Sequence, residues 1–191
     1  MRVAAIQFKA DKNDLSGSQK RLLALCEEAA AGGASLIVCP EMAMTGYLFR
    51  DADDVRRVAE PVDGQSFSLL SQLAAARGCT IVCGYPEVAR SKGQDRFYNS
   101  AWIIGTTGEL LYNYRKRLLF PADTTWAAPG ELPYPVLATP FGALTAGICM
   151  DLNDDRFTAF LRQAQARVIA FCTNWVDEAL DVRPYWRYRL S

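Results

Sequence analysis

The chain has 191 residues, half of them hydrophobic, and its 21 basic and 21 acidic residues balance to a net charge of zero. This length and composition predict a single globular domain over residues 1–191 with a substantial core, and they exclude a disordered chain. The balanced charge also argues against a nucleic-acid partner, because the basic cluster at 115–117 is too short to form a binding surface.

No apolar stretch is long enough to span a membrane, and the apolar run at 3–8 is too short for a signal peptide. We therefore expect a cytoplasmic protein without a membrane partner, whose six cysteines are free thiols rather than disulfides. With no histidine and no second Cys-x-x-Cys-like pair, a zinc site is not expected, and neither a metal nor a cofactor is predicted.

The first part of the chain predicts a β–α–β unit. A strand is expected over 3–8, a helix over about 14–31 and a second strand over 35–39. Leucines recur along one side of the helix at near-3.6 spacing, and Gly32-Gly33 follows its end, as glycine often does at helix C-termini. Because a crossover helix joins parallel strands, the first two strands are predicted to be parallel.

The remaining segments predict further strands and helices. Helices are expected over 67–77, 154–166 and after Asp181, and the proline-containing stretch 121–135 is expected to be a loop. Predicted strands cover 79–85, 97–104, 109–114, 143–149 and 167–172. The strands 97–104 and 109–114 are expected to form a hairpin through a Gly-Thr-Thr-Gly turn. Mixed parallel and antiparallel strands with flanking helices indicate a layered α/β sandwich.

Cys149 lies at the end of a predicted strand, in the sequence Gly-Ile-Cys-Met-Asp, where a tight turn can expose a thiol. The chain contains no histidine, which excludes Cys–His and Ser–His–Asp arrangements. A nucleophilic Cys149 would therefore need a carboxylate or a lysine to activate it. The alternative is a structural cysteine, since free cysteine is among the most buried residue types.

Two charged residues also follow predicted strands. Pro40 cannot donate to a sheet ladder and ends the strand 35–39, so Glu41 lies just past its end, where open α/β sheets usually place chemistry. Lys116 follows the strand 109–114 in the sequence Tyr-Arg-Lys. A glutamate beside apolar walls needs a partner, whereas Lys116 by itself could belong to a solvated strand end.

Glu41, Lys116 and Cys149, in this order and each at a strand end, resemble the nitrilase (carbon–nitrogen hydrolase) superfamily. The resemblance extends along the whole chain, and the Ile-Cys-Met-Asp-Leu-Asn segment is most similar to the branch of amidases that act on terminal amides. It implies a four-layer αββα sandwich. Relatives usually continue for several strands and helices beyond the position of Ser191, so the C-terminal part of the fold is expected to be missing and another chain would be needed to complete the second sheet.

The resemblance implies a cysteine-dependent hydrolase of non-peptide C–N bonds that needs no cofactor. A primary amide is the expected small-molecule substrate, and it would react through a thioester with release of ammonia. Glu41 would be the general base for Cys149, while Lys116 and the backbone N–H of Met150 would stabilise the oxyanion. Relatives often form homodimers or larger assemblies, so a homo-oligomer is one possible state.

Four residues in loops are expected to converge near the thiol and to line a small pocket: Tyr47, Trp126, Asn174 and Trp175. Ordinary packing is the alternative for each of them. No one of them is singled out by the sequence alone.

Two departures from the family pattern leave a second interpretation open. Many relatives carry a histidine where this chain has Leu118, and many carry a second glutamate before the Pro-Gly, where Asp123 is the only acid of the loop. A degenerate relative that acts as a binding or assembly module is therefore an alternative. Nitrile hydrolysis is a third, but true nitrilases commonly have tryptophan directly after the cysteine, and Met150 at that position favours amides.

Overall fold

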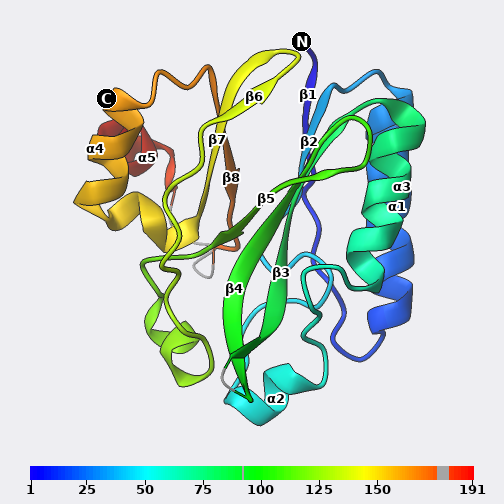
Figure 1. The fold of residues 1–191 in the computed structure, drawn as a ribbon, viewed down its shortest axis with the longest axis vertical. Helices are drawn as coiled ribbons and strands as arrows, with labels where there is room; N and C mark the ends of the chain where they lie inside the picture. Colours follow the sequence, from blue (N-terminus) through cyan, green and yellow to red (C-terminus); the bar gives the residue numbers. More distant parts are fainter. Residues whose placement is uncertain (92, 176–180) are drawn as a thin grey trace.

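The structure is a computed structural model that describes residues 1–91, 93–175 and 181–191. These residues form a five-stranded sheet in the order β1-β2-β3-β4-β5 and a three-stranded sheet in the order β6-β7-β8. The two sheets lie between two layers of helices, with α1 and α3 on one outer side and α4 and α5 on the other (Figure 1). The αββα arrangement implied by the family resemblance is therefore confirmed.

The larger sheet begins with the predicted parallel pair. Strand β1 (Val3–Ala5) pairs in parallel with β2 (Leu36–Val38), and β2 pairs in parallel with β3 (Thr80–Ser91). Strands β4 (Gln94–Ile104) and β5 (Leu110–Arg115) continue the sheet antiparallel, as the predicted hairpin requires. Strand β5 is therefore an edge strand of this sheet, and it ends directly before Lys116.

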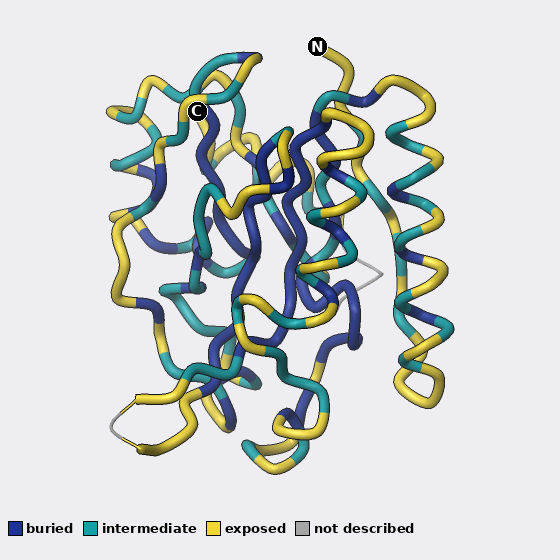
Figure 2. Tube along the Cα trace, turned by 45° about the vertical axis from the view of Figure 1, so that its right-hand side comes forward, coloured by how far each residue is buried: buried dark blue, intermediate teal, exposed yellow. Residues whose placement is uncertain are grey.

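Two helices cover the outer face of this sheet. Helix α1 (Leu15–Ala31) begins where the Asp14 side chain accepts from the Gly17 amide, and helix α3 (Gln65–Arg77) ends at Gly78 in the left-handed conformation. Their buried side chains pack on β2, β3 and β4 in one hydrophobic cluster. Figure 2 shows that the central strands are mostly buried while the outer sides of the helices are exposed.

The smaller sheet carries the cysteine. Strand β6 (Leu137–Thr139) pairs antiparallel with β7 (Gly142–Ile148), which pairs in parallel with β8 (Val168–Cys172). Helix α4 (Asp155–Gln163) joins β7 to β8, and α5 (Arg183–Leu190) lies beside it. A second hydrophobic cluster, contributed by strands of both sheets, fills the space between them. This packing brings the ends of β2, β5, β7 and β8 toward one region.

Several boundaries differ from the sequence-based predictions. Strand β1 is shorter than predicted, and β3 and β4 are longer because their pairing continues out to Ser91 and Gln94. Strand β6 and the short helix α2 (Ala52–Arg56) were not predicted, since three and five residues are too few to show a period. The proline-containing stretch includes a 3₁₀ helix over Pro121–Thr125.

Candidate active site

Glu41 is held in a fully buried position just past the end of β2. One carboxylate oxygen, Oε1, accepts from Lys116 Nζ at 2.8 Å and from Asn99 Nδ2 at 2.8 Å. The other, Oε2, accepts from the backbone amide of Asn174 at 3.0 Å, beyond the end of β8. The predicted placement of Glu41 at a strand end is found, and residues from both sheets fix its carboxylate.

Strand β3 passes directly behind Glu41, and this approach requires a glycine. The Gly84 amide donates to the Pro40 carbonyl, and the Ala43 amide donates to the Gly84 carbonyl. A Cβ at Gly84 would lie 2.7 Å from the Glu41 Cα, closer than packed atoms can come. The Glu41 loop is therefore seated on the backbone of β3.

Lys116 follows β5 and is fully buried, whereas the sequence alone left open that it belongs to a solvated strand end. Its ammonium donates to Glu41 Oε1 at 2.8 Å and to Asp123 Oδ2 at 2.6 Å. Burial alone would lower the pKa of Lys116, but the two carboxylates outweigh burial and hold that pKa above its ordinary value. The residue is a fixed cation, not a solvated strand end.

Asp123 completes this buried charge cluster. Its Oδ1 accepts from the Tyr47 hydroxyl at 2.7 Å, and its Oδ2 accepts from Lys116 and, at 3.4 Å, from Asn99 Nδ2. The sequence showed Asp123 only as the single acid of its loop. Its placement could not be derived from spacing alone, because the 3₁₀ turn at Pro121–Thr125 sets the direction of the side chain.

Cys149 follows β7 in an unusual backbone conformation. Its φ is +44°, in the left-handed region that non-glycine residues rarely occupy, and a 3₁₀ turn begins at this residue. Such conformations typically cost about 1–3 kcal/mol and persist where the surroundings enforce them. The side chain is half-buried, whereas the other five cysteines are buried. The structure thus distinguishes Cys149 from the structural cysteines.

The electrostatic surroundings keep the Cys149 thiol protonated at rest. Burial is the main reason that its pKa rises to about 12, and the neighbouring Glu41 carboxylate raises it further, while Lys116 acts in the opposite direction. Burial also raises the pKa of Glu41 above 4.5, against the lowering effect of Lys116. A neutral thiol therefore lies beside a carboxylate with a raised pKa and a permanent positive charge.

Of the other predicted site residues, three adjoin the charge cluster or Cys149, and the two tryptophans pack against other aromatic rings. Tyr47 contacts Asp123, Asn174 contacts Glu41 through its backbone, and Met150 directly follows Cys149 in the 3₁₀ turn. Trp126 is buried and packs edge-on against Phe49, in the hydrophobic cluster that includes Tyr47. Trp175 is 38% exposed and packs against Trp186 of α5.

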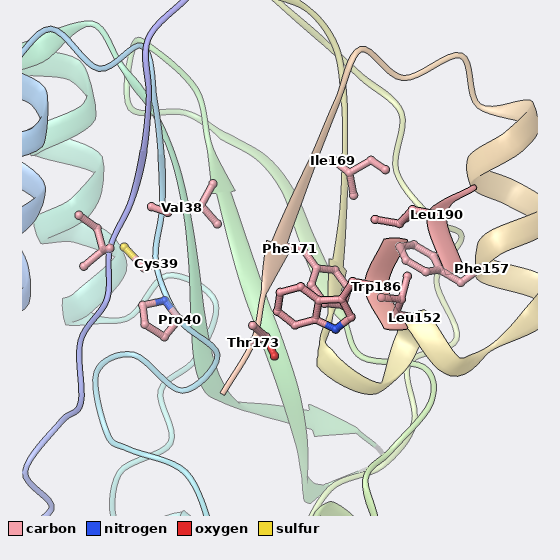
Figure 3. A pocket seen from close by; sticks show the side chains of 12 residues that line it. Val38, Cys39, Pro40, Leu152, Phe157, Ile169, Phe171, Thr173, Trp186 and Leu190 are labelled. Atoms are coloured by element: carbon pink, nitrogen blue, oxygen red, sulfur yellow. The ribbon is translucent and has the colours of Figure 1, made fainter. Parts of the chain in front are cut away.

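An apolar cavity of about 320 Å³ lies next to this region, between β1–β2 and β8–α5 (Figure 3). Val38, Cys39 and Pro40 line one side, and Phe171, Trp186 and Leu190 line the other. None of Glu41, Lys116 and Cys149 lines it. The cavity is therefore distinct from the charge cluster, although both border the end of β2.

Every helix in the part of the chain that the structure describes is too short or too polar to span a lipid bilayer. Within the same residues, no group of three or more Cys, Asp or Glu side chains is arranged to hold a metal ion.

Known proteins resemble this chain over most of its length. It is 28% identical over 165 residues to a protein N-terminal amidase of Schizosaccharomyces pombe, covering 83% of this chain and 58% of the relative. It is 30% identical over 177 residues to a nitrilase of Pyrococcus abyssi, covering 92% of this chain and 66% of that relative. The chain thus spans less than two thirds of the length of these relatives.

A solved structure shows the same fold. It is an amidase from Nesterenkonia sp. AN1, with a TM-score of 0.74 and 23% identity over 94% of this chain and 69% of that one. The structure is of a Glu-to-Gln mutant in which acrylamide has undergone Michael addition at the active-site cysteine. The family model for carbon–nitrogen hydrolases matches residues 2–188. This chain therefore belongs to the carbon–nitrogen hydrolase family.

Proposed function

We propose that this chain carries the active site of a cysteine-dependent hydrolase that cleaves a non-peptide C–N bond, most simply that of a primary amide. The observation that carries the proposal is the fully buried Lys116, paired with Glu41 at 2.8 Å and Asp123 at 2.6 Å beside the strained Cys149 turn. Burying three charged groups has a large desolvation cost, so such a cluster is weak evidence for a stabilising role alone. Clusters of ionisable groups with perturbed pKa values concentrate at active sites.

The first step follows from the resting protonation states. The Cys149 thiol is neutral, so Glu41 takes its proton as the sulfur attacks the amide carbon. The C–S bond forms, and the carbonyl electron pair moves to oxygen. Lys116 and the backbone N–H of Met150 then stabilise the resulting oxyanion, a contribution of about 10²–10³ in rate for one such donor.

The proton held by Glu41 then completes the cycle. Glu41 gives it to the amide nitrogen, the C–N bond breaks, and ammonia leaves with a thioester on Cys149. Water attacks the thioester while Glu41 accepts one of its protons. Collapse of the second tetrahedral intermediate releases the carboxylic acid, and the proton returns to the Cys149 sulfur.

We further propose that Tyr47, Met150, Asn174 and Trp175 line the substrate site, with Trp126 supporting this wall through the packing it shares with Tyr47. Tyr47 and Asn174 already contact the carboxylates of the cluster. Trp175 offers an exposed apolar surface near the end of β8. The identity of the acyl group depends on these loops, because one fold hosts many substrates.

The position of Asp123 favours catalysis over the alternative of a degenerate binding module. A relative that had lost its chemistry would not need a second buried carboxylate on Lys116, yet Asp123 supplies one at 2.6 Å. Amides are favoured by the likeness to the N-terminal amidase, and a nitrile substrate, suggested by the likeness to the Pyrococcus nitrilase, would use the same residues.

The deciding experiment is ammonia release from a panel of primary amides, ω-amido acids, carbamoyl compounds and nitriles. We expect release by the wild-type protein and none by Cys149→Ala. Cys79→Ala is the matched control, because Cys79 is a fully buried cysteine outside the charge cluster, and this variant should retain turnover. Equal release by the wild type and Cys149→Ala would reject the mechanism, and silence of the wild type on all substrates would favour the binding module.

The pH profile of kcat/KM is expected to have an acid limb set by Glu41. A protonated Glu41 cannot accept the Cys149 proton, so activity should fall as the pH drops through its pKa. Because burial raises that pKa, the midpoint should lie above 4.5. The charge of Asp123 also raises it, so Asp123→Asn should move the midpoint to lower pH. A midpoint at or below 4.5 in the wild type would contradict this assignment.

Gly84→Ala is expected to displace the Glu41 loop. The added methyl would lie 2.7 Å from the Glu41 Cα and 2.7 Å from the Pro40 carbonyl oxygen, and neither backbone atom can move freely. We expect a loss of about 1–3 kcal/mol in the free energy of unfolding and, from a displacement on the order of 1 Å, about a 100-fold lower kcat. Thermal unfolding and ammonia release measure the two effects.

Gly32→Ala is the control for this substitution. Its φ is −70°, and an added Cβ would come no closer than 3.3 Å to a neighbouring atom. It should leave turnover unchanged and stability nearly so. Wild-type activity and stability in Gly84→Ala would show that β3 does not seat the Glu41 loop.

A further inference from the structure

Asp151 is a fully buried carboxylate two residues after Cys149, and the proposed chemistry does not use it. Its Oδ1 accepts from the backbone amides of Arg117 and Leu118, each at 3.0 Å. Its Oδ2 accepts from the backbone amide of Ile148 at 3.0 Å and from the Tyr114 hydroxyl at 2.8 Å. All four partners are donors, so the carboxylate acts only as an acceptor.

These partners belong to different sheets. Tyr114 lies on β5, and Arg117 and Leu118 directly follow Lys116, whereas Ile148 directly precedes Cys149 at the end of β7. Strand β5 pairs with β4, and β7 pairs with β6 and β8, so no ladder of hydrogen bonds joins β5 to β7. Side chains between the sheets must therefore set the separation of the Lys116 and Cys149 segments.

The turn at Cys149 also needs side-chain contacts that hold its strained backbone in place. The residue has a φ of +44°, and the amide immediately before it, that of Ile148, is held by Asp151. The Asp151 carbonyl accepts from the Asp154 amide and closes the 3₁₀ turn. A strained conformation persists only where several contacts determine it. Asp151 supplies contacts on both sides of the thiol.

We propose that Asp151 is a positioning residue that holds the Cys149 turn against the end of β5 and so fixes the thiol relative to the Lys116 ammonium. This inference rests on the proposed function, in which Lys116 stabilises the oxyanion formed by attack of Cys149. Asp151 does not touch the reacting atoms. It acts through the backbone amides of Ile148, Arg117 and Leu118.

Asp151→Asn tests whether the Asp151 carboxylate holds the Cys149 turn against the end of β5, with almost no change in side-chain volume. If the new NH₂ group replaced Oδ1, it would face the two amides of Arg117 and Leu118, donor against donor. If it replaced Oδ2, the Tyr114 hydroxyl could turn to accept, but the Ile148 amide would lose its partner. Either orientation removes at least one hydrogen bond between the side chain and a backbone amide. The second orientation frees the amide of Ile148, the residue directly before Cys149.

Tyr114→Phe is the matched control, because it removes one hydrogen bond from the same carboxylate and keeps the three backbone amides. Both variants should lose stability of a similar size, about 1–3 kcal/mol for an unpaired buried group. Only Asp151→Asn should release a segment that carries Lys116 or Cys149. We expect its kcat to fall about 100-fold with little change in KM, and that of Tyr114→Phe to fall far less.

Alkylation of Cys149 by iodoacetamide gives a readout that needs no substrate. Lys116 lowers the thiol pKa, so moving the ammonium away should raise that pKa and slow alkylation at every pH below about 12. We expect alkylation of Asp151→Asn to be about tenfold slower than that of wild type, and alkylation of Tyr114→Phe to be close to wild type. Peptide mass spectrometry assigns the modified cysteine.

The outcomes separate this inference from the proposed function. Equal losses of kcat in the two variants, or unchanged alkylation of Asp151→Asn, would reduce Asp151 to a structural residue and overturn the inference. If the wild type hydrolysed nothing, the proposed function would fail, but slower alkylation of Asp151→Asn would still support the positioning of Cys149 by Asp151.

Discussion

Glu41→Gln is expected to lower ammonia release by about 10³–10⁴-fold, near the upper end for general acid–base catalysis, because one carboxylate serves the attack, the departure of ammonia and the hydrolysis of the thioester. The glutamine carbonyl can still accept from Lys116 and Asn99, but its NH₂ group then faces the backbone amide of Asn174, donor against donor, and the side chain cannot take the Cys149 proton. Lys116 keeps Asp123 as its ionic partner at 2.6 Å, so the buried cation is not left unpaired. The loss in the free energy of unfolding should therefore be that of one unpaired amide, about 1–3 kcal/mol, and not that of an unpaired buried charge.

The same variant should react faster with iodoacetamide. The charge of Glu41 and its contact with the thiol both raise the pKa of Cys149, so their removal lowers that pKa and increases the thiolate fraction at a given pH. Turnover and alkylation should thus change in opposite directions. Loss of both would indicate a collapsed site, and retention of turnover would remove Glu41 from the proposed chemistry. Cys149→Ala, which cannot be alkylated at this position, provides the background rate.

The strand ends were the part of the site that could be predicted from the sequence. Pro40 follows β2, a predicted strand ends at the Tyr-Arg-Lys sequence, and an apolar strand ends directly before Cys149, so local chemistry alone placed each residue near a strand end. Local sequence patterns could not predict that these strand ends lie close together, because their proximity depends on how the two sheets pack. The family resemblance, confirmed by the fold, predicted this arrangement.

The polar residues around Glu41, Lys116 and Cys149 were harder to predict. Asn99 lies within β4 and looks like any polar residue of a strand, yet its amide donates to both Glu41 and Asp123. Asp151 appeared only as part of a motif, and its four donors come from two strands and the turn after β5. Most of these contacts join residues that are distant in sequence, and such contacts leave no local period or spacing.

Aromatic residues in loops were the least determined. Trp126 and Trp175 were grouped together on sequence, because both lie in loops that are expected to converge near the thiol. The structure buries Trp126 against Phe49 and leaves Trp175 partly exposed against Trp186. The side of a loop on which an aromatic ring packs depends on its tertiary neighbours, which composition does not reveal.

Lys116→Met is expected to destabilise the fold as well as abolish turnover. The substitution leaves Glu41 and Asp123 buried without the ammonium that lies 2.8 Å and 2.6 Å from them. Breaking a buried pair in this way costs about 3–5 kcal/mol, which corresponds to a fall in Tm of about 6–20 °C for a chain of this size. Lys20→Met, at an exposed lysine, is the matched control and should change the free energy of unfolding by less than about 0.5 kcal/mol.

Two further results would identify uncompensated charge as the cause of this loss. Without Lys116, burial raises the pKa of Glu41 further above its unfolded value of 4.5, so the folded state takes up protons as the pH falls. The stability deficit of Lys116→Met should therefore shrink between neutral pH and about 4.5. Adding Glu41→Gln and Asp123→Asn to the same variant should restore stability at neutral pH but not turnover, because neutral polar groups need no cation. A deficit that is constant with pH and persists in the triple variant would instead assign the effect of Lys116 to packing of its aliphatic chain.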